Sequence, residues 1–229
     1  MQTSDQAAAR QYANDLERYF YENTGRVIHK WLHYFEIYDR HFAAFRNRPV
    51  TIVEIGVNKG GSLQMWKNYF GAQAHIYGID INPDCRRLAE ERIEIMIGSQ
   101  SDRSFLRSVA KSIPHIDILI DDGGHTMEQQ ITTFEELYPH IQPHGVYLCE
   151  DLHTSYWKKF GGSYRGKNTF IEFSKHLIDQ LNAWHSEKRK FGVDDFTRST
   201  HSMHFYDSVL VIEKRPMSEP SHVKKGVDT

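Results

Sequence analysis

From Val50 onward, short apolar runs alternate with stretches of helical periodicity. The apolar runs cover 50–55, 76–81, 93–97, 116–120 and 146–149, and the helix-like stretches between them cover 62–70, 84–91, 102–111 and 127–140. Apolar strands separated by helices are typical of a parallel sheet covered on both faces. The pattern therefore predicts an α/β fold with a doubly wound sheet, and ligands bind such a sheet at the carboxyl ends of its strands.

Helices are also expected on either side of this region. Apolar spacing predicts amphipathic helices over 6–20 and about 29–46, the second rich in aromatic residues, and a later helix over 168–187. Residues 204–206 and 208–212 are expected to close the sheet as a hairpin. We therefore divide the chain into an N-terminal helical extension or lid (1–47), a main domain (48–215) and a flexible tail (216–229).

Composition excludes several partners and locations. Basic and acidic residues nearly balance, 28 against 30, which gives no sign of a nucleic-acid or membrane-surface binder. No window approaches the roughly 18 uncharged apolar residues of a membrane span, and the first residues lack the apolar core of a secretory signal. Two cysteines, Cys85 and Cys149, cannot form a disulfide framework. We expect a cytoplasmic protein.

The end of the first strand carries a glycine motif. The sequence runs Glu54-Ile-Gly56-Val-Asn-Lys-Gly60-Gly-Ser62, and the second strand ends at Asp80. Glycines let a ligand approach the backbone, the following helix offers unpaired N–H groups, and an acid after the second strand can accept hydrogen bonds from ribose hydroxyls. The spacing is not GxGxxG, which argues against a nicotinamide dehydrogenase. The alternative is an ordinary glycine turn with a helix-capping Asp.

The third strand is followed by Ser99 and Gln100. From there, on the same side of the sheet as Asp80, both side chains can reach the edge of an adenine. The alternative is a plain helix start with its N-cap at Ser101, and the two interpretations are compatible.

The fourth and fifth strands end in acids and histidines. The sequences are Asp121-Asp122-Gly-Gly-His125 and Glu150-Asp151-Leu-His153. Adjacent carboxyl ends bring four carboxylates into one small volume, where they repel unless a cation or protons neutralise them. A hard divalent ion such as Mg²⁺ is the simplest solution, with Asp122, Glu150 and Asp151 as ligands and Asp121 turned toward the glycine loop.

His125 is the candidate general base, because an imidazole pKa near 6.5 suits proton abstraction at neutral pH. Alternatives are helix-capping acids beside a packed histidine, or a non-haem Fe(II) oxygenase face made by His125, Asp122 and His153. The chain has 14 histidines, and most of the others, including His41 and His204, are expected to be surface or core residues. His33 and Tyr38 are exceptions, because their helix can cover the crevice, and the loop 156–167 is expected to border an acceptor pocket.

These segments together resemble the class I S-adenosylmethionine-dependent methyltransferases, and more narrowly the metal-dependent sugar O-methyltransferases of macrolide biosynthesis. The resemblance covers about 27–214 and rests on His29-Lys30-Trp31, Tyr34-Phe35, Ile37-Tyr-Asp-Arg-His41, the motifs quoted above, and Glu150-Asp-Leu-His-Thr-Ser-Tyr-Trp157. It implies a Rossmann-like, mostly parallel seven-stranded sheet with an antiparallel last strand.

The resemblance also implies a function. S-adenosylmethionine would be held by Glu54, Gly56, Gly60, Ser62, Asp80, Ser99, Gln100 and Asp121. Mg²⁺ would be held by Asp122, Glu150 and Asp151, with His125 as the catalytic base. We expect methyl transfer to a hydroxyl of a glycosylated small molecule, by a homo-oligomer without nucleic-acid or membrane partners. A catalytically silent protein that binds the cofactor only is the alternative from another class.

Overall fold

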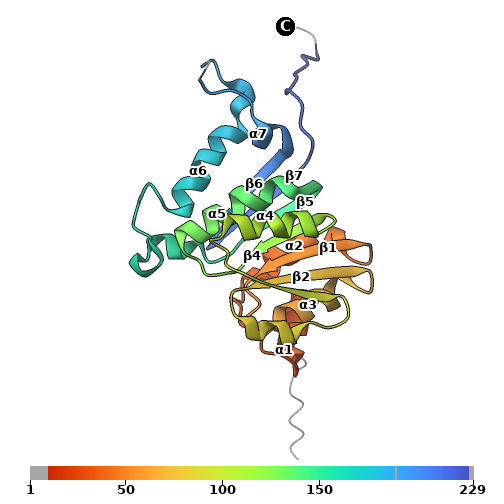
Figure 1. Ribbon diagram of the computed structural model, residues 1–229. Coiled ribbons are helices and arrows are strands. Elements are labelled where there is room, and N and C mark those ends of the chain that lie inside the picture. Colours follow the sequence, from red (N-terminus) through yellow and green to blue (C-terminus); the bar gives the residue numbers. More distant parts are fainter. Residues whose placement is uncertain (1–9, 189, 227–229) are drawn as a thin grey trace, which may run out of the picture.

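The computed structural model describes residues 10–188 and 190–226. Seven strands form one sheet in the order β3-β2-β1-β4-β5-β7-β6 (Figure 1). Neighbours from β3 to β5 pair in parallel, whereas β7 is antiparallel to both β5 and β6. The bounds are β1 Val50–Ile55, β2 Ala74–Asp80, β3 Ile93–Ile97, β4 Ile116–Asp121, β5 Ile141–Cys149, β6 Thr200–Tyr206 and β7 Val209–Lys214. The predicted mostly parallel, Rossmann-like seven-stranded fold is confirmed.

The α-helices are α1 Asp15–Glu22, α2 Tyr34–Phe42, α3 Gly61–Phe70, α4 Arg103–Ser112, α5 Met127–Leu137, α6 Phe170–Leu181 and α7 Asp195–Ser199. Short 3-10 segments are η1 Ala43–Phe45, η2 Pro83–Leu88, η3 Tyr138–His140, η4 Leu152–Tyr156, η5 Lys158–Phe160 and η6 Ala183–His185. Within the described residues, no helix is long and apolar enough to cross a membrane.

Helices cover both faces of the sheet. Successive side chains of a strand point to opposite faces, so Ile52 of β1 packs with α1, α2 and α3, whereas Val53 packs with α4, α5 and α6. Figure 1 shows α4 and α5 side by side across one face. Because every residue of β1 is buried, its apolar run is nearly continuous. The N-terminal helices belong to the core cluster of the first face.

Both helices expected before β1 are shorter than predicted. The helix expected over 6–20 begins at Asp15, because the Asn14 side chain caps it by accepting a hydrogen bond from the Glu17 N–H; residues 1–9 lie outside the described part. The helix expected over 29–46 begins at Tyr34. Its first residues instead form a non-helical segment, 29–33, which passes over the carboxyl ends of the strands and carries Lys30 into the site described next.

Candidate active site

A cavity of about 700 Å³ lies at the carboxyl ends of β1, β2, β4 and β5. This volume is within the range of small-molecule sites. Of the residues singled out from the sequence, it is lined by Gly56, Asp80, Gln100, Asp122, His125, Glu150, Asp151 and His153. Glu54, Gly60, Ser62, Ser99 and Asp121 lie outside that lining, in the strand ends, the loops and the start of α3 that support it.

The glycine loop is fixed mainly by contacts within the chain. Gly56 has φ +97°, and a Cβ there would lie 1.9 Å from the backbone oxygen of Asp122. Gly60 is left-handed, at φ +76°, and precedes α3. The Asp80 carboxylate accepts hydrogen bonds from the N–H groups of Val57 and Asn58 at 2.9 and 3.0 Å. Asp80 therefore orders the glycine loop, and it remains on the cavity wall.

Glu54 and Ser62 form a buried pair below the cavity. The Ser62 hydroxyl donates to Glu54 Oε2 at 2.9 Å. Burial raises the pKa of Glu54 to about 7, against the opposing effect of Lys30. The hydrogen bond between these two side chains links β1 to the start of α3.

Gln100 is turned toward the loop that follows β4. Its amide donates to Asp121 Oδ1 at 2.5 Å and accepts from the Gly124 N–H at 3.0 Å. Asp121 is fully buried, and burial raises its pKa to about 7. Ser99 accepts a hydrogen bond from the Ser101 N–H at 3.2 Å. These residues shape the wall beside β4, and their contact with a cofactor remains a prediction.

Asp122, His125 and Asp151 converge in the cavity. His125 Nε2 lies 3.5 Å from Asp151 Oδ2 and 3.9 Å from Asp122 Oδ1. One ligand atom from each of the three lies within 4.8 Å of the others. His125 and Asp151 both have left-handed backbone, at φ +56° and +57°. Such conformations are costly for residues other than glycine and gather at functional sites.

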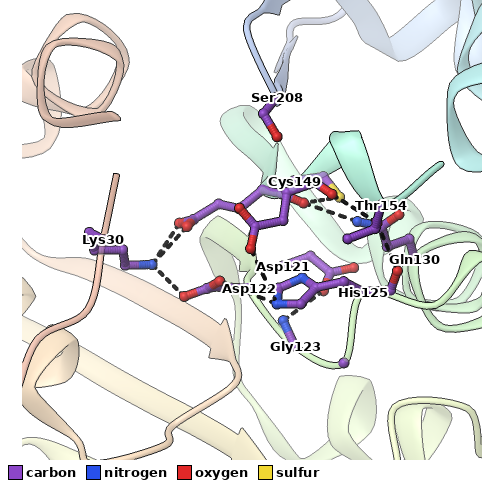
Figure 2. Close-up of polar contacts among 12 residues, drawn as sticks. Lys30, Asp121, Asp122, Gly123, His125, Gln130, Cys149, Thr154 and Ser208 are labelled. Atoms are coloured by element: carbon purple, nitrogen blue, oxygen red, sulfur yellow. Dashed lines mark hydrogen bonds and ion pairs between the residues drawn. The ribbon is translucent and has the colours of Figure 1, made fainter. Parts of the chain in front are cut away.

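Lys30 is the site residue that sequence reasoning missed. Its ammonium lies 2.5 Å from Asp122 Oδ2, 2.8 Å from Glu150 Oε1 and 2.9 Å from Glu150 Oε2, and its side chain is only 2% exposed. Figure 2 shows it entering from the N-terminal segment to meet the acids that follow the strands. Asp122 lies 92 positions away, so local periodicity could not indicate the pairing. The one sequence feature that could have pointed to Lys30 is that it is the single charge within His29-Lys-Trp-Leu32.

The pKa shifts reflect one ammonium group, that of Lys30, facing the three acids Asp122, Glu150 and Glu54. Burial alone lowers the pKa of Lys30, but Asp122, Glu150 and Glu54 reverse this and raise it above its usual range. Burial and the Asp122 charge raise the pKa of Glu150 well above its usual range, although Lys30 and Tyr38 oppose them. The ammonium stays charged, and the raised pKa values of Glu54 and Glu150 show that it compensates these acids only in part.

Lys30 removes part of the electrostatic need for a metal ion at this site. Lys30 already neutralises part of the acidic cluster, so repulsion alone no longer demands a divalent ion. Asp122 and Asp151 each offer carboxylate oxygens, the ligands that Mg²⁺ prefers, beside His125. Both oxygens of Glu150 contact Lys30, and Tyr38 donates to Oε1 at 2.7 Å. The donor set fits a hard ion, and Glu150 can join it only if Lys30 withdraws.

His153 does not join this group. Its Nδ1 lies 2.5 Å from the Ser208 hydroxyl, and in the part of the chain that the structure describes, the ligand group around His125 contains Asp122 and Asp151 instead. The Fe(II) arrangement of His125, Asp122 and His153 is thus not assembled. His33 is exposed, with Nε2 3.1 Å from the Asp207 carbonyl.

Comparison with known proteins identifies the class. Residues 53–152 match the family described as "Methyltransferase domain". This stretch runs from β1 to the start of η4 and contains the glycine loop, Asp80 and the Asp122–His125–Asp151 group. The chain therefore contains a methyltransferase domain of that family.

The curated relatives that the chain resembles are named as O-methyltransferases. The chain is 41% identical over 200 residues to the 8-demethyl-8-alpha-L-rhamnosyl tetracenomycin-C 2'-O-methyltransferase of Streptomyces olivaceus, covering 82% of this chain and 52% of that protein. It is 38% identical over 213 residues to the mycinamicin VI 2''-O-methyltransferase of Micromonospora griseorubida, covering 86% and 51%. The chain is thus a relative of the sugar O-methyltransferases, and it spans about half the length of the curated relatives it matches.

A solved relative shares the fold. The structure of the MycE methyltransferase in complex with Mg, SAH and mycinamycin VI matches with a TM-score of 0.76 and 36% identity, over 82% of this chain and 50% of that one. A second MycE structure with Mg and SAH matches with a TM-score of 0.78 and 32% identity, over 93% and 56%. Both comparisons support Mg²⁺ and S-adenosylmethionine as the cofactors of this type of domain.

Proposed function

We propose that the protein transfers a methyl group from S-adenosylmethionine to a sugar hydroxyl of a glycosylated small molecule. One observation carries the proposal. A single cavity holds the glycine loop with Asp80 on one side and His125 with Asp122 and Asp151 on the other. The first group suits a nucleoside, and the second suits activation of a hydroxyl.

The methyl donor would occupy the half of the cavity near β1 and β2. Asp80 retains lone pairs for ribose hydroxyls, and Gln100 and the Gly98 backbone line the neighbouring wall. Glu54, Ser62, Gly60 and Asp121 would act from behind, by holding the loops in place. Ser99 would complete the same wall.

His125 would act as the base. The acceptor hydroxyl loses its proton to His125 Nε2 while its oxygen attacks the sulfonium methyl carbon. The S–CH₃ bond breaks as the O–CH₃ bond forms, and S-adenosylhomocysteine leaves with the electron pair on sulfur. Asp151, 3.5 Å from Nε2, would stabilise the imidazolium. Much of the rate enhancement would come from alignment of the reacting atoms.

Asp122, Asp151 and Glu150 would hold Mg²⁺, with Glu150 released from Lys30. When bound there, the ion would orient the acceptor oxygens and lower the pKa of the attacking hydroxyl. Exposed aromatic side chains beside the cavity suit a sugar face: Trp31 and Trp157 are 55% and 46% exposed, and His153 packs against both. Assembly as a homo-oligomer and a cytoplasmic location remain predictions.

The test is methyl transfer from labelled S-adenosylmethionine to a rhamnosylated polyketide or a glycosylated macrolide, with the product identified by its added methyl group. His125→Ala should lower kcat by about 10² to 10⁴, the usual contribution of a general base. Affinity for S-adenosylhomocysteine, measured by calorimetry, should stay within about threefold, because His125 lies on the acceptor side of the cavity.

His153→Ala is the matched control. It removes a second histidine from the same cavity wall, and we expect kcat to fall much less. Near-normal turnover of His125→Ala would exclude His125 as the base. Tight S-adenosylhomocysteine binding with no transfer to any glycosylated acceptor would instead favour the catalytically silent alternative.

A further inference from the structure

A second group of metal-ligating side chains lies at the edge of the sheet. His41 is at the end of α2, His204 is on the edge strand β6, and Glu213 is on β7. His41 Nδ1 lies 2.7 Å from Glu213 Oε1, and His204 Nε2 lies 3.8 Å from the same oxygen. One ligand atom from each of the three lies within 4.8 Å of the others. None of the three lines the catalytic cavity.

The spacing is close to that of a coordinated ion. Ligands about 2.0–2.1 Å from a tetrahedral ion lie about 3.3 Å from one another. The two distances to Glu213 Oε1, 2.7 and 3.8 Å, bracket this value. Small rotations of the side chains would therefore equalise them. His204 and Glu213 are 37% and 35% exposed at their side chains, so an ion can enter from solvent and keep a water in the open position.

Outer contacts already orient the ligands. The Nε2 atom of His41 lies 2.8 Å from the Tyr206 hydroxyl. A metal-ligating imidazole characteristically donates its second N–H to an oxygen, which fixes the tautomer and the ring. Tyr206 can accept that hydrogen bond and leave Nδ1 free to coordinate. The Ser202 hydroxyl donates to Glu213 Oε2 at 3.2 Å and so orients this carboxylate. It also lies 3.0 Å from His204 Nε2, and coordination of an ion by that nitrogen would replace this contact.

We propose that His41, His204 and Glu213 form a transition-metal site of the Zn²⁺ type that fastens α2 to the edge of the sheet. Two imidazoles and one carboxylate suit Zn²⁺, whereas Mg²⁺ prefers oxygen ligands only. The consequence reaches the cavity, because α2 also carries Tyr34 and Tyr38. Their hydroxyls donate to Asp151 and Glu150 at 2.8 and 2.7 Å. An ion at the edge site would hold the helix that positions these two tyrosines.

Zn²⁺ titration of the 229-residue chain by calorimetry, with Mg²⁺ in excess, tests the site, and Co²⁺ provides an absorption spectrum that reports coordination. His204→Ala should weaken Zn²⁺ binding by more than 100-fold, beyond the roughly 10–100-fold expected for Tyr206→Phe, which removes only an outer partner. His201→Ala is the matched control, since it removes another histidine from β6, outside the group. Its Zn²⁺ affinity should equal that of the parent chain.

His204 is partly exposed, so its variant is expected to fold, and circular dichroism checks this. Equal Zn²⁺ affinity of the His204→Ala and His201→Ala proteins would overturn the proposal. So would Zn²⁺ binding that only Asp122→Asn abolishes, because the ion would then occupy the catalytic cavity alone. In either case His41, His204 and Glu213 would be a hydrogen-bonded cluster that binds no metal. A Co²⁺ spectrum that His204→Ala removes and His201→Ala retains would support coordination at the edge.

Discussion

The molecule has two groups of metal-ligating side chains: the cavity group (Asp122, His125 and Asp151, with Glu150 beside them) and the edge group (His41, His204 and Glu213). They differ in donor chemistry, although residues of α2 contact both. The cavity group is rich in carboxylates and already holds an ammonium, from Lys30. The edge group has two imidazoles for one carboxylate. Oxygen donors favour Mg²⁺, and imidazoles favour Zn²⁺. The kinds of side chain in each group, more than the number of ligands, therefore decide which ion that group suits.

The charge balance also differs. In the cavity, Lys30 contacts Asp122 and Glu150 and lies 3.8 Å from Glu54, which leaves excess negative charge. At the edge, each polar group has a neighbour of complementary chemistry. The cavity group should therefore respond strongly to any change of charge, and the edge group should respond mainly to loss of a ligand.

The largest effect is expected from Lys30→Met. Removing one partner of a buried ion pair costs about 3–5 kcal/mol, because the remaining charges are left without compensation. The free energy of unfolding, measured in urea without divalent ions, should fall by that amount. Mg²⁺ should then stabilise the variant more than the parent, since the ion no longer competes with an ammonium for Glu150.

Lys59→Met is the control for this substitution. Lys59 also lines the cavity but is exposed, so the same loss of charge should cost little. If Mg²⁺ stabilised the parent and the Lys30→Met protein equally, Lys30 and the ion would not share a position. The contrast between the two ligand groups would then rest on donor type alone.

The strand ends were predictable because their chemistry is local. Apolar runs located β1, β2, β4 and β5, and the parallel topology implied that Asp80, Asp122, Glu150 and His125 would meet at one edge. Exact helix starts were less accessible, since Asn14 capping and the non-helical segment 29–33 depend on contacts with distant residues. Gly56 lines the cavity, and the structure adds a reason for glycine there that the motif did not indicate: its missing side chain accommodates the Asp122 backbone.

The sequence could not indicate the contacts of Lys30 or those of the edge histidines His41 and His204, and the physical cause is the same. Lys30 meets Glu150 across 120 positions, and His41 meets Glu213 across 172. Neither pairing has a periodicity that a single sequence can reveal. His41 and His204 were expected to be surface or core residues, and only the packing of α2 on β6 and β7 brings them together.

Glu54→Gln should produce the next largest effect, and it depends on pH. Burial raises the pKa of Glu54 to about 7 from an ordinary value of 4.5. Between these values the folded protein binds more protons than the unfolded chain, so stability falls as pH rises. The loss of stability caused by ionisation of the buried Glu54 is complete above pH 7 and amounts to about 3 kcal/mol. At pH 8 the variant should therefore be more stable than the parent, and at pH 4 the gain should vanish.

Glu213→Gln is the counterpart at the edge. Its carboxylate contacts His41 Nδ1 at 2.7 Å, so the substitution should lower stability at pH 8 instead of raising it. Urea titrations of both variants across pH 4–8 measure the two effects. A gain from both substitutions would mean that excess negative charge is not confined to the cavity group.

The smallest expected effect comes from a pair of tyrosines, each holding one ligand. Tyr34 donates to Asp151 at 2.8 Å, and Tyr206 lies 2.8 Å from His41 Nε2. Each substitution by Phe should lower the free energy of unfolding by about 1 kcal/mol, the net value of a hydrogen bond. Their direct effects on metal binding should differ: Tyr34→Phe removes a partner of Asp151 and should weaken mainly Mg²⁺ binding, whereas Tyr206→Phe removes a partner of His41 and should weaken mainly Zn²⁺ binding. Calorimetric titration of each variant with each ion measures this, and a loss of both affinities from one variant would show that α2 couples the two groups.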